Sequence, residues 1–263
     1  MEPGIYPDIS NKEYHSTTAL SKGGLVSLSR SPSHMHTPSK QIPAFRTGTI
    51  AHHSALQRDI FDTRYVVAPE VNKRTKAGKA ELKEFEESLA PGQEIITQDE
   101  MDMFTDMSDA LWNHPQAAAL MSGGIAEQSV FWDEPQYGFL CKCRPDYLIG
   151  RKVCVDYKTT VDASPKSFAK SIANFAYHLQ VEWYTRGLRE IGKGVERFIF
   201  IAQEKTPPYA VACYECDQKS IDHASKQIDS LLEIYANCEA FDDWPGYSEE
   251  IVELSMPGWA YYS

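Results

Sequence analysis

The feature that most constrains the fold of this sequence is a change in hydrophobic period near residue 127. Before that point, apolar side chains such as Met103, Met107 and Leu111 recur at helical spacing. After it, apolar and polar side chains alternate with a period of two, which is typical of half-buried strands. The sequence therefore predicts a mainly helical part that is followed by a sheet.

Five segments carry the strand pattern, at 127–134, 139–150, 152–159, 196–205 and 209–217. Helical patterns separate and follow them, at 164–192 and 217–238. This order predicts an α/β (α+β) fold with a mixed central β-sheet flanked by helices. We expect a single domain over 1–263, with a mainly helical N-terminal part (1–125), a sheet core (126–240) and a C-terminal tail (241–263).

Capping residues predict several helix boundaries. Thr47 or Thr49 can act as the N-cap of a helix that begins near them, because a threonine hydroxyl accepts hydrogen bonds from the first helical turn. Ser164 followed by Pro165 predicts another helix start, since proline fits the first helical position. We also expect a short helix over 16–29. The last helix is expected to bury Ile221, Ile228, Leu231, Leu232 and Ile234.

The composition is that of a soluble globular protein, with 42% hydrophobic and 24% charged residues. No apolar run approaches the roughly 20 residues that span a bilayer, and the first residues lack the pattern of a signal peptide. We therefore expect a cytoplasmic protein with no membrane contact. The six cysteines lack the spacing of metal ligands, so we interpret them as reduced, mostly buried side chains.

The net charge of −11 is unevenly distributed along the chain. Residues 40–79 contain eight Lys and Arg but three Asp and Glu, whereas residues 239–263 contain six acids and neither Lys nor Arg. An acidic protein can still bind a phosphate backbone in a locally positive groove. The overall charge therefore does not exclude nucleic acid as a partner.

Two aspartates and a lysine stand close together in the predicted sheet. Alternation over 152–159 puts Asp156 and Lys158 on one strand face, and a tight turn at Gly150 pairs this strand with the one that carries Asp146. Two neighbouring carboxylates repel each other unless one is protonated or a cation lies between them. Carboxylate oxygens beside an ammonium group fit Mg²⁺ or Mn²⁺ better than a soft metal.

Such a site fits phosphodiester hydrolysis, in which a divalent metal supplies hydroxide near neutral pH and stabilises charge on the phosphorus centre. Lys158 would orient or deprotonate the attacking water. A D-x-K motif is short, however, and permits a second interpretation. In that interpretation, Asp146 opens a turn, and Asp156 and Lys158 form an ion pair at the surface.

Neighbouring motifs favour the first interpretation. R-P-D at 144–146, D-Y-K-T at 156–159 and Q-x-x-x-Y at 180–184 resemble the PD-(D/E)-x-K nuclease superfamily. G-x-x-x-H at 48–52 resembles its RecB-like branch. YPDISNKEYH, VAPEVNKRTKAGK, GFLCKCRPD and YHLQVEWY resemble segments of the exonuclease VIII (RecE-type) nuclease domain, in the same order and along nearly the whole chain.

The resemblance implies a metal site built from His52, Asp146, Asp156 and the backbone carbonyl of Tyr157, with Lys158 serving the water. It also implies a role for an acid at the start of the first strand. Glu127 occupies that position, where it would orient a ligand or bind a second metal. A solvated strand end is the alternative, because acids are usually exposed.

The resemblance further implies contacts with DNA. Gln180 and Tyr184 are four residues apart and so share a helix face, which would lie beside the active site, although helix packing is the alternative. Arg144 would contact the cleaved strand or pair with a carboxylate. A basic loop that enters a helix would bind a DNA phosphate unless it is a solvated charge run: Lys73, Arg74 and Lys76.

The resemblance implies a Mg²⁺-dependent 5′→3′ double-strand DNA exonuclease that leaves 3′ single-stranded tails, with Mn²⁺ as a substitute. We expect the chain to form a ring-shaped homo-tetramer. Its expected partners are double-stranded DNA ends and a RecT-like single-strand annealing protein. The expected setting is recombination or repair, in a bacterial or phage-encoded system. The alternatives are another PD-(D/E)-x-K nuclease, either an endonuclease or a Cas4-like enzyme, and a catalytically inactive DNA-end-binding module.

Overall fold

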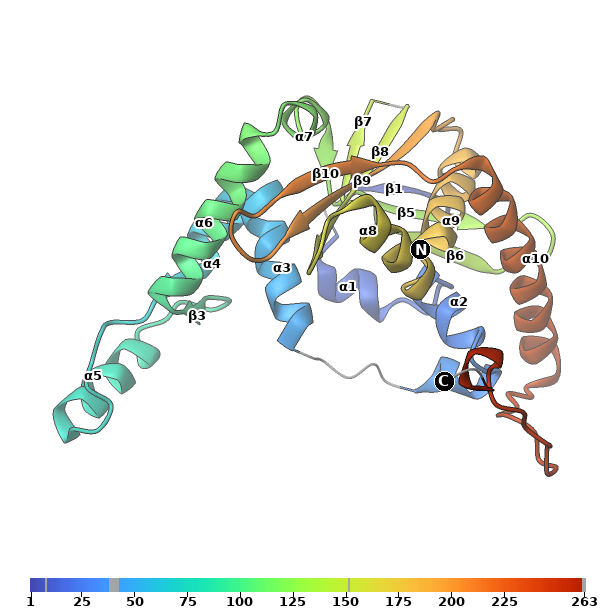
Figure 1. Cartoon of the computed structure of the whole chain (residues 1–263), viewed down its shortest axis with the longest axis horizontal. Coiled ribbons are helices and arrows are strands. Elements are labelled where there is room, and N and C mark those ends of the chain that lie inside the picture. The colour runs from blue at the N-terminus through green and yellow to red at the C-terminus, as the bar shows by residue number, and fades with distance from the viewer. Residues whose placement is uncertain (8, 38–42, 151, 262–263) are drawn as a thin grey trace.

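The computed structural model describes residues 1–7, 9–37, 43–150 and 152–261. Its centre is a mixed sheet of five strands in the order β10-β9-β8-β7-β4, and a second sheet has the order β1-β5-β6 (Figure 1). The strands of the first sheet are β4 (Ile125–Ala126), β7 (Tyr147–Ile149), β8 (Val153–Thr160), β9 (Arg197–Glu204) and β10 (Val211–Tyr214). Those of the second are β1 (Gly4–Tyr6), β5 (Ser129–Asp133) and β6 (Leu140–Cys143). The mixed sheets with flanking helices confirm the predicted fold class.

Strand β8 is the centre of the larger sheet. It pairs antiparallel with β7 and parallel with β9, and the parallel pair is connected through α8 (Pro165–Asn174) and α9 (Tyr177–Glu190). As the alternation predicts, Val155 and Tyr157 belong to one buried layer and Cys154 to the other. One side of this strand therefore faces the N-terminal helices, and the other faces α9.

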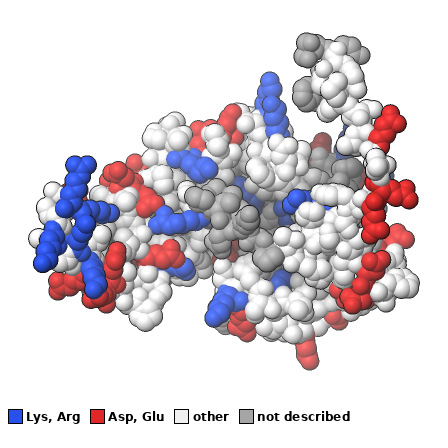
Figure 2. All heavy atoms as spheres, turned by 90° about the horizontal axis from the view of Figure 1, so that it is seen from below, with Lys and Arg blue, Asp and Glu red and all other residues white. Residues whose placement is uncertain are grey.

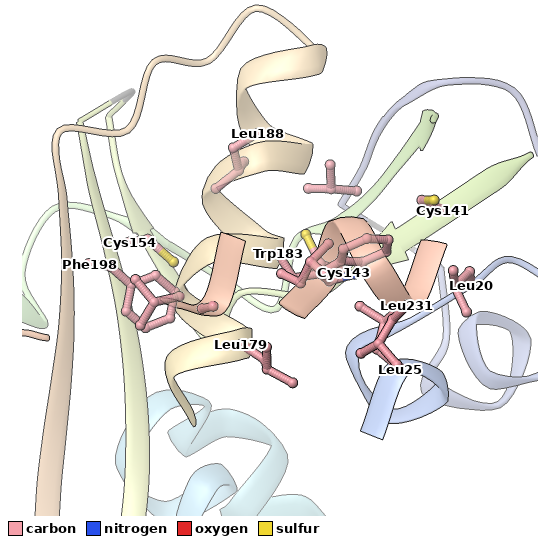
Figure 3. Packing of buried hydrophobic residues seen from close by; sticks show 14 of the residues in the cluster. Leu20, Leu25, Cys141, Cys143, Cys154, Leu179, Trp183, Leu188, Phe198 and Leu231 are labelled. Carbon is pink, nitrogen blue, oxygen red and sulfur yellow. The ribbon is translucent and has the colours of Figure 1, made fainter. Parts of the chain in front are cut away.

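Helices cover both faces of the larger sheet. On one face, α3 (Pro43–Leu56), α4 (Arg58–Arg64), α6 (Gln98–Asn113) and α7 (Pro115–Leu120) enclose a core that includes Ile50, Phe104 and Leu111. On the other, α2 (Lys22–Leu28), α9 and α10 (Gln218–Phe241) pack with the smaller sheet around Leu25 and Trp183 (Figure 3). Burying each such side chain contributes roughly 1.5–3 kcal/mol.

An arm projects from the body of the molecule (Figure 1). It contains the paired strands β2 (Tyr65–Val67) and β3 (Glu94–Ile96), with α5 (Lys76–Glu87) between them. The Thr75 hydroxyl caps α5 by accepting a hydrogen bond from the Gly78 amide. Helix α5 is charged and largely exposed.

Two predicted helix boundaries were wrong. Helix α3 begins at Pro43, before Thr47 and Thr49, because proline is favoured at the first helical position. The short helix expected over 16–29 is present as α2 but begins later, at Lys22, and a separate helix, α1 (Asn11–Ser16), precedes it; serine side chains cap both. The chain between them is extended because the backbone of Leu20 pairs with β6. The remaining short helices are η1 (Pro32–His36) and η2 (Gly258–Tyr261).

Other corrections concern strands and burial. The single strand expected over 139–150 is divided between two sheets as β6 and β7, and Pro145, which lacks a backbone donor, lies in the gap. Glu127 precedes β5 instead of starting it and has a φ of 52°. Ile234 is 41% exposed, because it lies on the outer side of α10, and Ile221 is only half-buried.

Candidate functional site

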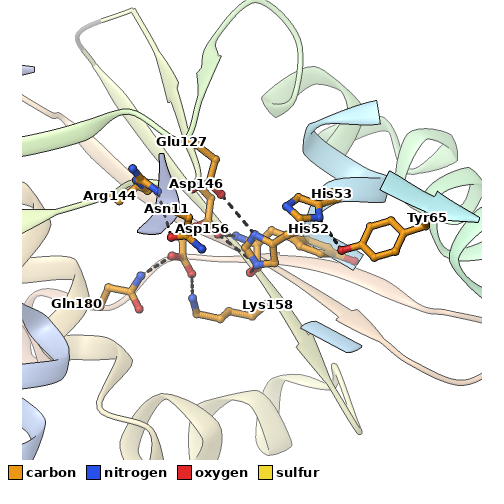
Figure 4. Close-up of polar contacts among 11 residues, drawn as sticks. Asn11, His52, His53, Tyr65, Glu127, Arg144, Asp146, Asp156, Lys158 and Gln180 are labelled. Atoms are coloured by element: carbon orange, nitrogen blue, oxygen red, sulfur yellow. Dashed lines mark hydrogen bonds and ion pairs between the residues drawn. The ribbon is translucent and has the colours of Figure 1, made fainter. Parts of the chain in front are cut away.

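Four elements of the fold bring the predicted site residues together (Figure 4). Asp156 and Lys158 lie on β8, and Asp146 immediately precedes β7. His52 comes from α3 on one face of the sheet, whereas Gln180 comes from α9 on the other. Residues far apart in the sequence therefore meet at one edge of the β7–β8 pair.

Strand register places the two aspartates next to each other. Tyr147 pairs with Val155 across the antiparallel ladder. Asp146, just before Tyr147, therefore lies opposite Asp156, just after Val155. The Asp146 carboxylate accepts a hydrogen bond of 2.7 Å from the Tyr157 amide, which fixes it against β8. The expected antiparallel approach of Asp146 and Asp156 is therefore present.

His52, Glu127 and Asp146 form a group of donors suited to a cation. The His52 Nε2 atom donates to the Tyr157 carbonyl at 2.9 Å and lies 3.7 Å from Asp146 Oδ2, and Nδ1 lies 3.9 Å from Glu127 Oε1. One ligand atom from each of the three side chains lies within 4.8 Å of the others. Carboxylate oxygens with one imidazole fit a divalent cation such as Mg²⁺ or Mn²⁺.

Asp156 is fully buried and is held from two sides. The Gln180 side-chain amide donates a hydrogen bond to Oδ1, and the Lys158 ammonium forms an ion pair with Oδ2. The same ammonium lies 5.2 Å from the centre of the Tyr177 ring. Asp156 is thus buried and its partner Lys158 is half-buried, unlike the surface ion pair of the alternative interpretation.

Burial dominates the electrostatics of the acidic residues. It raises the pKa of Asp156 to about 6, with repulsion from Asp146 adding to the effect, and it raises the pKa of Asp146 to about 6 although Lys158 opposes the rise. Burial and Asp146 together raise the pKa of Glu127 to about 8. Ionising these buried, neighbouring carboxylates therefore costs free energy. A cation bound among them would offset much of that cost.

The two basic residues of the site shift in opposite directions. Burial, followed by the charge of Lys158, lowers the pKa of His52 to about 4, so the imidazole is neutral and able to bind a metal. Burial also acts to lower the pKa of Lys158, but the carboxylates of Asp156 and Asp146 outweigh it and raise this pKa above its ordinary value. Lys158 is therefore a cation over the whole physiological range.

A cavity of about 700 Å³ opens beside the donors and is lined by Glu127, Arg144 and Tyr184. The Arg144 side chain donates to Ser129 Oγ at 2.8 Å and to the Ile9 carbonyl at 2.9 Å, and it forms no ion pair within the described residues. Tyr184 is half-buried and packs edge-on against Phe198. Arg144 and Tyr184 thus border the site, whereas Gln180 lies inside it.

The predicted phosphate-binding residues lie elsewhere. Lys73, Arg74 and Lys76 are exposed at the start of α5, at the end of the projecting arm. Lys and Arg side chains gather at that end of the molecule, beyond the body that carries the sheet (Figure 2). The structure does not bring this basic cluster to the carboxylates.

The sequence reasoning missed three residues that border the site. Lys22 donates a 2.8 Å hydrogen bond to the Phe175 carbonyl and lies 5.6 Å from the Tyr177 ring centre, and burial and Lys158 lower its pKa to about 8. His53, next to His52, forms a hydrogen bond of 2.8 Å with the Tyr65 hydroxyl. Periodicity could not point to Lys22 or Tyr177, because their helices meet only in the folded chain.

The six cysteines form no disulfide within the described residues, and Cys141, Cys143, Cys154 and Cys238 are buried, as expected of mostly buried side chains. Within the described residues, no cysteine belongs to a candidate metal group. None of the described helices is both long and apolar enough to cross a bilayer.

One solved structure shares this architecture. A "Putative exonuclease" from Eubacterium rectale superposes with a TM-score of 0.61 at 11% sequence identity, covering 95% of this chain and 96% of the other. An alkaline exonuclease from Laribacter hongkongensis gives a TM-score of 0.30 at 18% identity, covering 71% and 96%. No curated protein matches the sequence. Residues 28–255 match the model of the "PDDEXK-like domain of unknown function (DUF3799)". The chain therefore belongs to this PDDEXK-like family.

Proposed function

We propose that the protein is a Mg²⁺-dependent exonuclease that degrades the 5′-ended strand of duplex DNA and leaves a 3′ single-stranded tail. The observation that carries the proposal is the donor group of His52, Glu127 and Asp146 beside the Asp156–Lys158 pair. This set provides a site for a divalent cation and a fixed positive charge at the same point. Membership of a PDDEXK-like family supports its use in phosphodiester cleavage.

The cation would be held by His52, Asp146 and the Tyr157 carbonyl, together with Asp156 or Glu127. When bound, it would lower the pKa of a water molecule and stabilise charge on the phosphate. Gln180 fixes the orientation of the Asp156 carboxylate through its hydrogen bond to Oδ1. Such support of a metal-binding carboxylate is usually important for affinity and activity.

Lys158 would act as a cation rather than as a base. Its pKa lies above the ordinary lysine value, because two carboxylates stabilise the charged form. A protonated ammonium can donate hydrogen bonds to the attacking water and offset the charge of the phosphate, but it cannot remove a proton. Of the two roles that the sequence suggested for Lys158, the structure therefore favours orientation of the water.

The DNA would reach the carboxylates through the cavity that Arg144 and Tyr184 line. The exposed basic residues of the arm, Lys73, Arg74 and Lys76, would bind the duplex away from the cleaved bond. By family resemblance, we further propose a ring-shaped homo-tetramer that encloses the duplex and a RecT-like protein that receives the single-stranded tail. Mass measurement of the free protein in solution tests the tetramer directly.

A time course on linear duplex DNA labelled at one 5′ or one 3′ end tests the activity. With Mg²⁺, we expect early release of the 5′ label, late release of the 3′ label and no cutting of a covalently closed duplex. Equal cutting of the closed duplex would instead identify an endonuclease. DNA-end binding without cleavage would identify an inactive binding module.

Asp156→Ala and Lys158→Ala should abolish cleavage and leave the circular dichroism spectrum unchanged. Lys219→Ala, which replaces an exposed lysine in the first turn of α10, is a matched control that should cleave normally. Full activity of either site variant would show that the chemistry takes place elsewhere.

A further inference from the structure

The turn between α8 and α9 presents an aromatic ring to solvent. Phe175 is 59% exposed, whereas Phe168, Phe198 and Phe200 in the adjoining layer are buried. Ala176, the next residue, has a φ of 51°, a left-handed conformation that alanine rarely adopts. The chain therefore accepts backbone strain at the point where it leaves the Phe175 side chain outside the core.

The position of this turn is fixed by hydrogen bonds. The Phe175 amide donates to the Ser171 carbonyl at 3.0 Å, and the Ala176 amide donates to the Ala173 carbonyl at 3.2 Å. The Lys22 ammonium, from a distant part of the chain, donates to the Phe175 carbonyl at 2.8 Å. An exposed ring on a turn that is held from several sides is ordered before any ligand arrives.

Direct contacts connect the turn to the proposed active site. The Phe175 and Tyr177 ring centres are 5.6 Å apart. The Tyr177 ring in turn lies 5.2 Å from the ammonium of Lys158 and 5.6 Å from that of Lys22. Since Lys158 pairs with Asp156, the exposed ring is one aromatic contact away from the catalytic pair.

We propose that Phe175, Tyr177 and Lys22 form a nucleotide-binding platform, in which the Phe175 ring stacks on a base of the strand being cleaved. The platform rests on the proposed function, since it binds the substrate of the same site. Every nucleobase offers a π-face, so one exposed ring serves any sequence. Lys22 and Lys158 supply the positive charge that a backbone phosphate beside that base requires.

The platform makes Phe175 a positioning residue rather than a catalytic one. Removing its ring should weaken strand binding and leave the metal donors and Lys158 in place. We therefore expect Phe175→Ala to raise the KM for linear duplex DNA roughly tenfold, with a smaller change in kcat. Phe175→Trp should restore the wild-type KM, because an indole ring also stacks.

Base stacking can be measured directly with 2-aminopurine, whose fluorescence is quenched by contact with an aromatic ring. An Asp156→Ala background, which keeps Lys22 and Lys158, prevents cleavage while DNA ends that carry the probe near the 5′ terminus are bound. We expect quenching that Phe175→Ala abolishes and Phe175→Trp retains. Phe241→Ala, which removes another exposed ring (79%) at the end of α10, is the matched control and should change neither KM nor quenching.

A folded Phe175→Ala variant with the wild-type KM and undiminished quenching would overturn the platform while leaving the nuclease proposal intact. The melting temperature of the variant shows whether it is folded. A wild-type protein that cleaves no DNA would overturn the proposed function instead. Quenching that depends on Phe175 would then still support the platform as a nucleotide-binding site.

Discussion

Protons and a divalent cation should compete for the same carboxylates in this protein. Burial raises the pKa of both Asp146 and Asp156 to about 6 from an ordinary value of 3.8. In the metal-free protein, the stability that these raised pKa values contribute is present below about pH 4 and is lost as the pH rises through about 6. A cation binds the ionised carboxylates and reverses this loss, so it should stabilise the fold more at high pH.

The size of the effect follows from the fraction of each carboxyl that is ionised. At about pH 5, a group with a pKa of about 6 is ionised roughly one time in ten. At about pH 5, two such groups together reduce the apparent affinity for the cation roughly 100-fold relative to about pH 8. This reduction is a loss of about 3 kcal/mol in binding free energy. With cation in excess, this corresponds to a difference of roughly 6–12 °C in the Tm gain for a chain of this size.

The assay compares the Tm in Mg²⁺ with the Tm in a chelator, at about pH 5 and about pH 8. A calorimetric titration with Mn²⁺ at both pH values gives the affinities themselves. Glu249→Gln, in the exposed C-terminal segment, should keep the full difference, whereas Asp146→Asn should remove most of it. An equal gain in Tm at both pH values would refute the assignment of these buried carboxyls to a metal site.

Three further predictions concern single positions. Gln180→Met should lower activity and Mn²⁺ affinity roughly 10–100-fold, because the buried carboxylate that it orients loses a donor; unchanged Mn²⁺ affinity would argue against this role. The double variant Lys73→Ala/Arg74→Ala should reduce the slope of log affinity for duplex DNA against log salt by roughly two, and an identical slope would exclude phosphate contacts there. Gly187→Ala should destabilise the fold by about 1–3 kcal/mol in urea unfolding, because its Cβ would lie 2.4 Å from an indole carbon, whereas Gly194→Ala meets no atom within 4 Å and should be nearly neutral.

The alternation of side chains on strands was the most reliable guide to this fold. It correctly separated Val155 from Cys154 and Asp156, because a strand that is buried on both sides cannot shift by one residue without moving every side chain to the other face. The approach of Asp146 to Asp156 also followed from the sequence, since a short turn fixes the register of an antiparallel pair.

Long-range contacts account for what the sequence could not predict. The helix expected over 16–29 begins only at Lys22, because Leu20 pairs with β6, more than 100 residues away, and no local signal reports such a partner. Lys22 and Phe175 meet for the same reason. Gln180 was expected to lie beside the site and to contact DNA, and the structure shows that its amide is already used by Asp156.

The transfer of the chain from β6 to β7 bears on how this protein can be engineered. Arg144 and Pro145 are all that separate β6 from Asp146, the first aspartate of the proposed metal site, so neither sheet can slide without displacing that side chain. The turn between β5 and β6 contains no residue of the proposed site, so it is a better place to insert peptide tags or extra loops. We expect one residue added beside Pro145 to leave both sheets able to form but to misalign Asp146 in the proposed active site.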